Sequence, residues 1–245
     1  MAAPEVLLFI EDYIGQFDQA GQAYLRAHYR RYLKTFEACP EISGARVLDI
    51  GGGGFYGELL TRFNAYRFEE IEGDSIDFES SLLPYETEAF DGVMLCEVLE
   101  HFTEDPMHCL LEVNRITKPG GFFVCTTPNC VSWYSIHCAL RHLHPSRWAH
   151  YSATHKHIHS IHAREYVPHE MRPLFYGAGY SVDFLDTFDY GDTDLEWGPI
   201  PGFPTEDRGE TIICVGRKEG PPRMRYIKEC YAGYDVSFTE ENRYR

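Results

Sequence analysis

The sequence has few basic residues and lacks an apolar run long enough to cross a membrane. Its apolar stretches fall far short of the roughly 20 residues that a membrane helix needs, and no basic segment leads into one, so we expect neither a membrane helix nor a secretory leader. It contains 22 Lys and Arg against 38 Asp and Glu, a formal charge of −16. A surface this acidic repels phosphate backbones and anionic lipids, which argues against nucleic acid and membranes as partners.

The cysteines lack any CxxC pair, the spacing that many zinc sites and redox motifs use. Several of them fall inside apolar runs, where a small side chain is buried as a free thiol. We therefore expect free thiols in a reducing compartment, and a cytoplasmic protein with neither a disulfide framework nor a four-cysteine zinc site. The eight positions are Cys39, Cys96, Cys109, Cys125, Cys130, Cys138, Cys214 and Cys230.

Internal repeats and low-complexity linkers are also absent. The length of 245 residues, 44% of them hydrophobic, suits one domain of α/β size or at most two small ones. Apolar runs alternate with segments of helical periodicity, which is typical of an α/β sheet. The expected strands are 45–50, 66–72, the first part of 90–102, 122–129, 181–188 and 211–218, and the expected helices are 1–39, 57–63, the second part of 90–102, 105–121 and 164–180.

A glycine-rich turn follows the first expected strand. Glycines let the backbone approach a ligand closely, and the helix that follows presents free N–H groups at its start. Gly52-x-Gly54-x-x-Gly57 fits the dinucleotide pattern GxGxxG, so an NAD-dependent oxidoreductase has to be considered. Four consecutive glycines satisfy many patterns, however, and Asp49, two residues before the turn, is the more informative residue.

Four segments carry a resemblance to a known family. VLDIGGGGFYGELL (47–60) resembles motif I of class I S-adenosylmethionine (SAM)-dependent methyltransferases. LPYETEAFDGVMLCEVLEHF (83–102) and ITKPGGFFVCTTPN (116–129) resemble blocks of the ubiquinone-biosynthesis-like, or type 11, methyltransferases. HAREY (162–166) resembles an HNREY-type segment of a bacterial subgroup found among glycan and secondary-metabolite tailoring enzymes. The four blocks occur in the family's order, and the resemblance covers about residues 25–220.

The resemblance implies the fold and the activity. The fold is α/β, a Rossmann-like, open and mostly parallel sheet of the seven-stranded type with an antiparallel C-terminal hairpin. The cofactor is SAM, with S-adenosylhomocysteine (SAH) as product, and the acceptor is a small molecule or a sugar or glycan unit that is O-methylated. Two other classes stay open: a non-catalytic methyltransferase-like partner protein and an NAD-dependent oxidoreductase.

The resemblance also implies a domain organisation. Residues 1–44 are expected to form an N-terminal helical cap, 45–220 the methyltransferase domain and 221–245 a C-terminal extension. Within the domain, 131–163 is expected to be a substrate lid.

The turn itself is the first part of the implied SAM site. Asp49, Gly51, Gly52 and Gly53 match the family residues that hold the methionine part and the ribose of SAM. SAM carries a sulfonium and an ammonium group, which an acidic cleft suits. Residues 68–114 hold 14 acidic residues and no Lys or Arg.

The second part of the SAM site follows the second strand, where the sequence departs from the family. Glu72 matches the acidic residue that accepts from the ribose hydroxyls, with Glu70 as the alternative. Only three residues, 73–75, separate this strand from the segment IDF (76–78), too few for the crossover that parallel neighbours need. We therefore expect an edge strand to be lost or rearranged. In the family the adenine-binding wall comes from this region, so the resemblance implies that Asp77 and Phe78 contact the adenine.

The remaining candidates lie after the third and fourth blocks. Cys96 and Glu97 end a central strand at the sheet edge where open α/β sheets bind ligands, so we expect them to line the SAM site. His162, which matches the subgroup's HxREY histidine, is the expected catalytic base, and His101 is its rival. Glu165, in the same segment, is expected to be structural.

A histidine-rich stretch invites a metal interpretation. Alternate residues of a strand point to one face, so His155, His157 and His159 could converge on Zn²⁺ or Fe²⁺. The metal-dependent members of the wider fold use mostly carboxylates, and we expect a lid without a metal.

Overall fold

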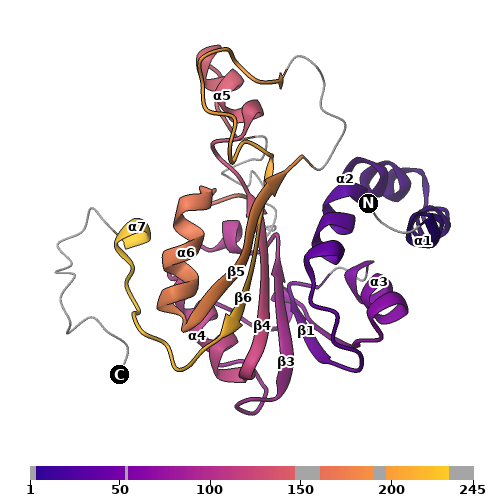
Figure 1. The fold of residues 1–245 in the computed structure, drawn as a ribbon, viewed down its shortest axis with the longest axis vertical. Helices are drawn as coiled ribbons and strands as arrows, with labels where there is room; N and C mark the ends of the chain where they lie inside the picture. Colours follow the sequence, from indigo (N-terminus) through magenta and orange to yellow (C-terminus); the bar gives the residue numbers. More distant parts are fainter. Residues whose placement is uncertain (1–3, 53–54, 147–160, 190–196, 232–245) are drawn as a thin grey trace.

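The computed structural model describes residues 4–52, 55–146, 161–189 and 197–231 (Figure 1). Six strands form one sheet in the order β2-β1-β3-β4-β6-β5. The first four of these strands are parallel to one another, and β6 runs antiparallel to both of its neighbours. The strands are β1 Arg46–Ile50, β2 Arg67–Ile71, β3 Phe90–Cys96, β4 Thr117–Pro128, β5 Tyr180–Phe188 and β6 Thr211–Lys218. The predicted mostly parallel sheet with its antiparallel C-terminal hairpin is confirmed.

The missing edge strand is confirmed as well. Gly73–Ser75 form a single 3-10 turn, η1, and residues 76–78 are not in a strand. β2 is therefore one end of the sheet. Residues 72–89, which connect β2 to β3, contain η1 but neither an α-helix nor a further strand.

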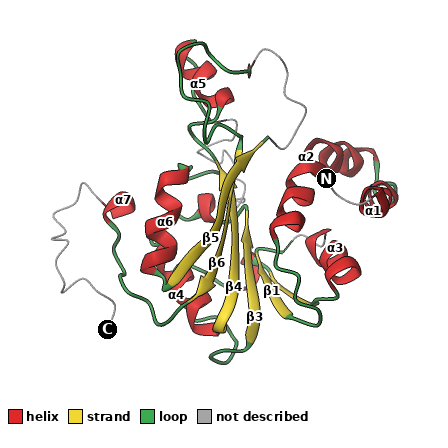
Figure 2. Cartoon of the chain, in the orientation of Figure 1, coloured by secondary structure: helices red, strands yellow, loops and turns green. Residues whose placement is uncertain are grey.

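Helices cover both faces of the sheet (Figure 2). On one face α1, α2 and α3 pack against apolar residues such as Val47 and Val124. On the other face α4 and α6 pack against Leu48 and Phe123. Successive residues of β1 and β4 thus face opposite layers, as strands buried on both sides do. The helices are α1 Pro4–Ile14, α2 Gln19–Ala38, α3 Phe55–Asn64, α4 Pro106–Ile116, α5 Trp133–Leu140, α6 Pro168–Gly177 and α7 Lys228–Tyr231.

Three expected helices differ in detail. The helix expected over 1–39 is two helices, because the Asp18 carboxylate accepts from Gly21 N–H at 2.8 Å and starts α2 anew. The helix expected after β3 is a single 3-10 turn, η2 (Leu99–His101). α4 ends at Ile116, and the Pro-Gly-Gly segment after it already belongs to β4.

No helix among the described residues is both long and apolar enough to cross a membrane. All eight cysteines are free thiols, as predicted, and five of them are buried.

Candidate functional site

The turn after β1 requires glycine at two positions. Gly51 and Gly52 have φ values of +107° and +67°, which L side chains rarely adopt. A Cβ on Gly51 would lie 2.4 Å from Cγ2 of Val98, and one on Gly52 would lie 3.3 Å from Cγ of Glu72. Gly51 N–H donates to the Ile71 carbonyl at 2.9 Å, which ties the turn to the end of β2. The first two glycines therefore let two strand ends and the loop after β3 meet closely.

A cavity of about 890 Å³ opens beside this turn, and we call it the glycine-turn cavity. Its volume and its place at the carboxyl edge of the strands are those of a cofactor-sized ligand site. Six of the predicted cofactor residues and one predicted catalytic residue line it: Gly51, Gly52, Glu72, Asp77, Phe78, Glu97 and His101. Glu70, the alternative to Glu72, is not among the lining residues.

Carboxylates dominate the wall of the glycine-turn cavity. Glu72, Asp77, Glu79, Glu97 and Glu104 line it, and no Lys or Arg does among the described residues. Hydrogen bonds from the Ser80 hydroxyl and the Glu79 N–H hold the pKa of Asp77 below its usual value. The cavity thus favours a cationic ligand over a pyrophosphate.

Glu79 also connects two segments of the cavity wall. Its carboxylate accepts from the backbone N–H groups of Thr103, Glu104 and Asp105 at 2.7 to 2.9 Å. These bonds fix the loop after η2 against the segment after η1, so both sides of the cavity are held by one side chain.

A second, smaller cavity of about 220 Å³ adjoins the first, and we call it the histidine cavity. Glu97 and His101 line both cavities, so the two are neighbours across these side chains. The wall of the histidine cavity comes from segments far apart in the chain: Tyr24, His28, Arg31, Glu97, Glu100, His101, Pro128, Asn129, Ser132, Tyr134, Ser135, Pro145, His162, Glu165, Glu210 and Thr211.

Glu97 lies at the junction of the cavities and has an unusual backbone. Its φ is +56°, rare for a residue with a side chain, and its N–H donates to the Thr126 carbonyl at 2.9 Å. Its carboxylate accepts from the Thr126 hydroxyl at 2.9 Å and from Arg31 at 3.0 Å. Backbone strain of this kind concentrates at functional sites. Glu97 also lines a third cavity, of about 360 Å³, together with Gly52 and Arg31.

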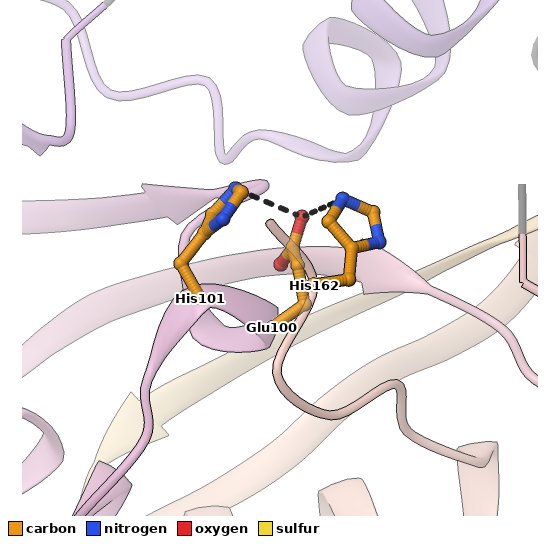
Figure 3. A group of neighbouring side chains, drawn as sticks. All are labelled: Glu100, His101 and His162. Carbon is orange, nitrogen blue, oxygen red and sulfur yellow. Dashed lines mark ion pairs between the residues drawn. The ribbon is translucent and has the colours of Figure 1, made fainter. Parts of the chain in front are cut away.

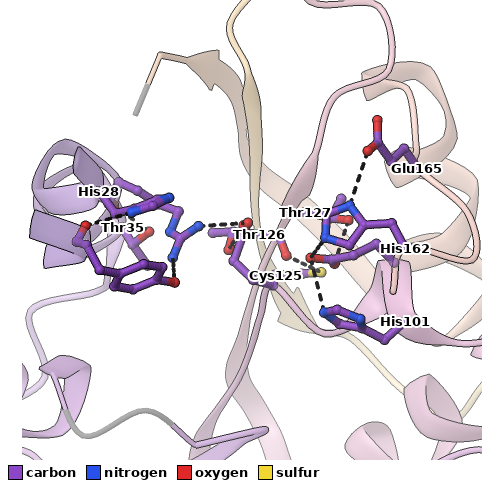
Figure 4. Close-up of polar contacts among 12 residues, drawn as sticks. His28, Thr35, His101, Cys125, Thr126, Thr127, His162 and Glu165 are labelled. Atoms are coloured by element: carbon purple, nitrogen blue, oxygen red, sulfur yellow. Dashed lines mark hydrogen bonds and ion pairs between the residues drawn. The ribbon is translucent and has the colours of Figure 1, made fainter. Parts of the chain in front are cut away.

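Arg31 is a site residue that sequence reasoning missed. It projects from α2, is 8% exposed, and reaches Glu97 at 3.0 Å. Figure 4 shows His28 and Thr35 of the same helix on one side of Thr126, and His101 and His162 on the other. Burial opposes the charge, but Glu97 and the surrounding tyrosines raise the pKa of Arg31 well above its usual value. Its Nε has no hydrogen-bond partner among the described residues. The signal was available, since Arg31 shares a helix face with Tyr24 and Thr35, seven residues before it and four after it.

The two predicted catalytic histidines come together around Glu100 (Figure 3). Nε2 of His101 and Nε2 of His162 each lie 3.9 Å from the same oxygen, Oε1 of Glu100. The rings lie edge to face with centroids 5.2 Å apart. Glu100, which sequence reasoning missed, is 1% exposed, and burial together with the charge of Glu97 raises its pKa well above the usual value.

The outer nitrogens of both rings are held by the segment 161–165. Nδ1 of His101 donates to the Ile161 carbonyl at 2.7 Å, and Nδ1 of His162 lies 3.1 Å from Oε1 of Glu165. Glu165 also accepts from the Ser146 hydroxyl at 2.7 Å. Glu165 therefore contacts a candidate catalytic residue and also lines the histidine cavity.

Two predicted cofactor residues, Asp49 and Cys96, do not line the glycine-turn cavity. Asp49 is 2% exposed on β1 and is not among the residues that line the cavities. Its Oδ2 has no hydrogen-bond partner among the described residues, and burial and then the charge of Glu70 raise its pKa well above the usual value. Cys96 lines the third cavity only, and Gly53 lies outside the described residues. The expected metal ligands His155, His157 and His159 also lie outside the described residues.

The chain covers part of several curated enzymes. It is 35% identical over 112 residues to a ubiquinone biosynthesis O-methyltransferase of Roseobacter denitrificans, and the match covers 38% of this chain and 45% of that protein. It is 32% identical over 124 residues to the enzyme of the same name in Dinoroseobacter shibae, and that match covers 43% of this chain and 48% of that protein. These matches thus span about half the length of the relatives.

Solved structures resemble the chain over most of its length. A methyltransferase from a complex with the Trm112 methyltransferase activator of Haloferax volcanii aligns with 86% of this chain and 98% of its own, at 21% identity and a TM-score of 0.56. A SAM-dependent methyltransferase of Archaeoglobus fulgidus aligns with 80% of this chain and 94% of its own, at 16% identity and a TM-score of 0.52. At such identities the likeness establishes the fold.

A family model decides the membership. The model described as a methyltransferase domain matches residues 18–183, well over half of the chain, and this range includes α2, the glycine turn and the Glu100 cluster. The chain therefore belongs to the methyltransferase domain family.

Proposed function

We propose that this chain transfers a methyl group from SAM to a hydroxyl of a small molecule or sugar unit. The observation that carries the proposal is the junction at Glu97 and His101, where a cofactor-sized acidic cavity meets a smaller cavity lined by histidines. A methyl donor in the first and an acceptor in the second would face each other there, and alignment supplies much of the catalysis for an activated methyl group.

The glycine-turn cavity fits SAM in charge and in shape. Its carboxylates suit a sulfonium, and Glu72, which lies beside Gly52, is the residue that would accept from the ribose hydroxyls. Two buried polar atoms have no described partner, Oδ2 of Asp49 and Nε of Arg31. Asp49 precedes the turn by two residues, and Arg31 lines the third cavity together with Gly52. An acid and a base at this place suit the ammonium and carboxylate groups of the methionine part.

When bound, SAM supplies a methyl group that an acceptor oxygen takes as the carbon–sulfur bond breaks, and sulfur keeps the electron pair to give SAH. The acceptor hydroxyl must lose its proton. His162 and His101 line the histidine cavity and are the groups that activate this hydroxyl. Direct removal of the proton by His162 is the simplest form of that role, and His101, which lines both cavities, is its rival.

The choice of an oxygen acceptor rests on the names of the relatives. The curated matches are O-methyltransferases, and the polar wall of the histidine cavity suits a hydroxylated acceptor. The acidic walls disfavour a nucleic acid. The proposed location is the cytoplasm, because eight free thiols suit a reducing compartment.

The proposed domain roles follow the same division. Residues 45–220 carry the transfer, 1–44 form a helical cap that contributes Arg31, and 221–245 are an extension. The segment 131–163 covers the acceptor side, to which Ser132, Tyr134 and Ser135 contribute. Its residues 147–160 lie outside the described residues.

SAH binding tests the proposal. Calorimetry on wild type should show one SAH site, and Glu72→Ala and Asp49→Ala should each weaken it at least tenfold, since charge-assisted hydrogen bonds contribute about 1.5–3 kcal/mol. Thermal unfolding with SAM, SAH, NAD and NADP separates the alternatives, because an oxidoreductase would be stabilised by the nicotinamide cofactors. A screen of hydroxylated metabolites for SAH release distinguishes an enzyme from a non-catalytic partner protein.

A further inference from the structure

Glu100, His101 and His162 together have the composition of a transition-metal site. One ligand atom from each residue, an oxygen and two nitrogens, lies within 4.8 Å of the other two (Figure 3). Two imidazoles and one carboxylate suit the divalent ions Zn²⁺, Fe²⁺ and Mn²⁺. The residues come from two segments about 60 positions apart, Glu100 and His101 from η2 and His162 from the segment before α6.

The distances between Nε2 of His101, Nε2 of His162 and Oε1 of Glu100 are too long for direct hydrogen bonds but suit three ligands around one ion. Both Nε2 atoms lie 3.9 Å from Oε1 of Glu100, beyond hydrogen-bond distance. Ligands about 2.0–2.2 Å from a central ion lie roughly 3–4 Å apart, so the three atoms need to move only by a fraction of an ångström.

The outer contacts are those that orient metal-binding histidines. A ligating imidazole usually donates its second N–H to a backbone carbonyl or a carboxylate. Nδ1 of His101 donates to the Ile161 carbonyl at 2.7 Å, and Nδ1 of His162 contacts Glu165 at 3.1 Å. The carboxylate of Glu100 is oriented in the same way, because its other oxygen accepts from the Thr127 hydroxyl at 3.0 Å.

We infer that Glu100, His101 and His162 bind one divalent transition-metal ion in the wall of the histidine cavity. This rests on the proposed function for its purpose: an ion there would coordinate the acceptor hydroxyl and make its proton easier to lose. The two histidines would then activate the acceptor through the ion, in place of direct proton removal by His162. Sequence reasoning considered a different trio, His155, His157 and His159, and expected no metal.

Zn²⁺ titration of EDTA-treated full-length protein tests the site. Calorimetry should show one Zn²⁺ per chain, with affinity at least tenfold lower in His101→Ala, His162→Ala and Glu100→Gln. Glu165→Gln, which removes only an outer contact, should lose about tenfold or somewhat less. His108→Ala is the matched control, because His108 also bonds to a backbone carbonyl, that of Ser81 at 3.0 Å, but is outside the cluster. Its affinity should equal that of wild type.

SAH affinity, measured on the same variants, separates this inference from the proposed function. Unchanged SAH binding in Glu100→Gln shows that the variant is folded, so loss of Zn²⁺ would then support the site. Zn²⁺ affinity that stays at the wild-type value in both histidine variants would overturn it, as would a wild type that binds no Zn²⁺ at millimolar concentration. A wild type that binds Zn²⁺ but not SAH would leave the metal site standing and remove the proposed function.

Discussion

The two adjoining cavities differ in how the chain builds them. The residues that line the glycine-turn cavity all lie between Gly51 and Glu104, a stretch of little more than 50 residues around the ends of β1, β2 and β3. The histidine cavity draws on six separate stretches that begin at Tyr24 and end at Thr211. The first is a property of one local unit, whereas the second exists only when the whole sheet and the helices above it are assembled.

This difference separates two kinds of function. A local cavity that follows a strand–turn–helix unit suits a ligand common to a family, such as the methyl donor. A cavity assembled from distant segments can change its wall without disturbing the turn, which suits an acceptor that differs between family members. Glu97 and His101 belong to both walls, so substitutions near them test the division most directly.

The largest expected effect falls on the assembled cavity. His162→Gln should lower the single-turnover rate of methyl transfer about 100-fold or more and leave SAH affinity unchanged, because His162 lines only the histidine cavity. His137→Gln on α5, which bonds to the Gly198 carbonyl, should keep the wild-type rate. A full rate in His162→Gln with a loss in His101→Gln would move the role to His101, and full rates in both would exclude either histidine.

The next effect falls on the local cavity. Glu72→Ala should weaken SAH binding at least tenfold, because Glu72 lines the glycine-turn cavity beside Gly52. Glu70→Ala, two residues earlier on β2, should bind SAH as wild type does. Equal losses in the two variants, measured by calorimetry, would mean that net charge rather than a specific contact sets the affinity.

A smaller effect, on both SAH affinity and the transfer rate, is expected at the junction of the two cavities. Glu97→Gln keeps the shape of the side chain and removes the negative charge that accepts from Arg31 and Thr126. The difference is worth about 1 kcal/mol, so both SAH affinity and the transfer rate should fall about fivefold. A loss in only one of the two quantities would show that Glu97 serves one cavity alone.

The last effect concerns stability and its dependence on pH, not ligand binding or rate. The folded pKa of Asp49 is raised by burial, so the native state binds a proton more tightly than the unfolded state does. Wild-type stability should then fall as pH rises from the unfolded pKa towards the folded one, by up to about 1.4 kcal/mol per pH unit, and level off above it. Asp49→Asn, which cannot ionise, should show a shallower slope in denaturant titrations at several pH values. Equal slopes would contradict a raised pKa.

The sequence was enough to predict the sheet and most of the local cavity. Buried parallel strands appear as apolar runs, and the three residues between the predicted strand 66–72 and the segment 76–78 were too few for another crossover, so even the lost edge strand was predictable. Five residues that sequence reasoning named for the cofactor site line the glycine-turn cavity: Gly51, Gly52, Glu72, Asp77 and Phe78.

The assembled cavity was largely out of reach. Sequence reasoning named His101 and His162, and gave Glu165 only a structural role, but it missed Arg31 and Glu100, which lie in two other segments of the cavity wall. Sequence spacing carries no information about which of these segments meet. Glu100 and His101 belong to the 3-10 turn η2, and Glu100 is buried there. The α-helix that the sequence led us to expect would have given these two side chains other directions.

The loss of the edge strand has a consequence for how the chain meets its own copies. An exposed edge strand presents unpaired N–H and C=O groups, and a strand of another chain can pair with them. β2 holds that place here, and of its five residues Arg67, Glu69 and Glu70 are charged. At the opposite edge, β5 carries Asp183 and Asp186 exposed and has an irregular register between Val182 and Phe184. Charged side chains at both edges and the irregular register of β5 disfavour strand-to-strand aggregation, so the sheet can be one strand narrower without becoming a template for itself.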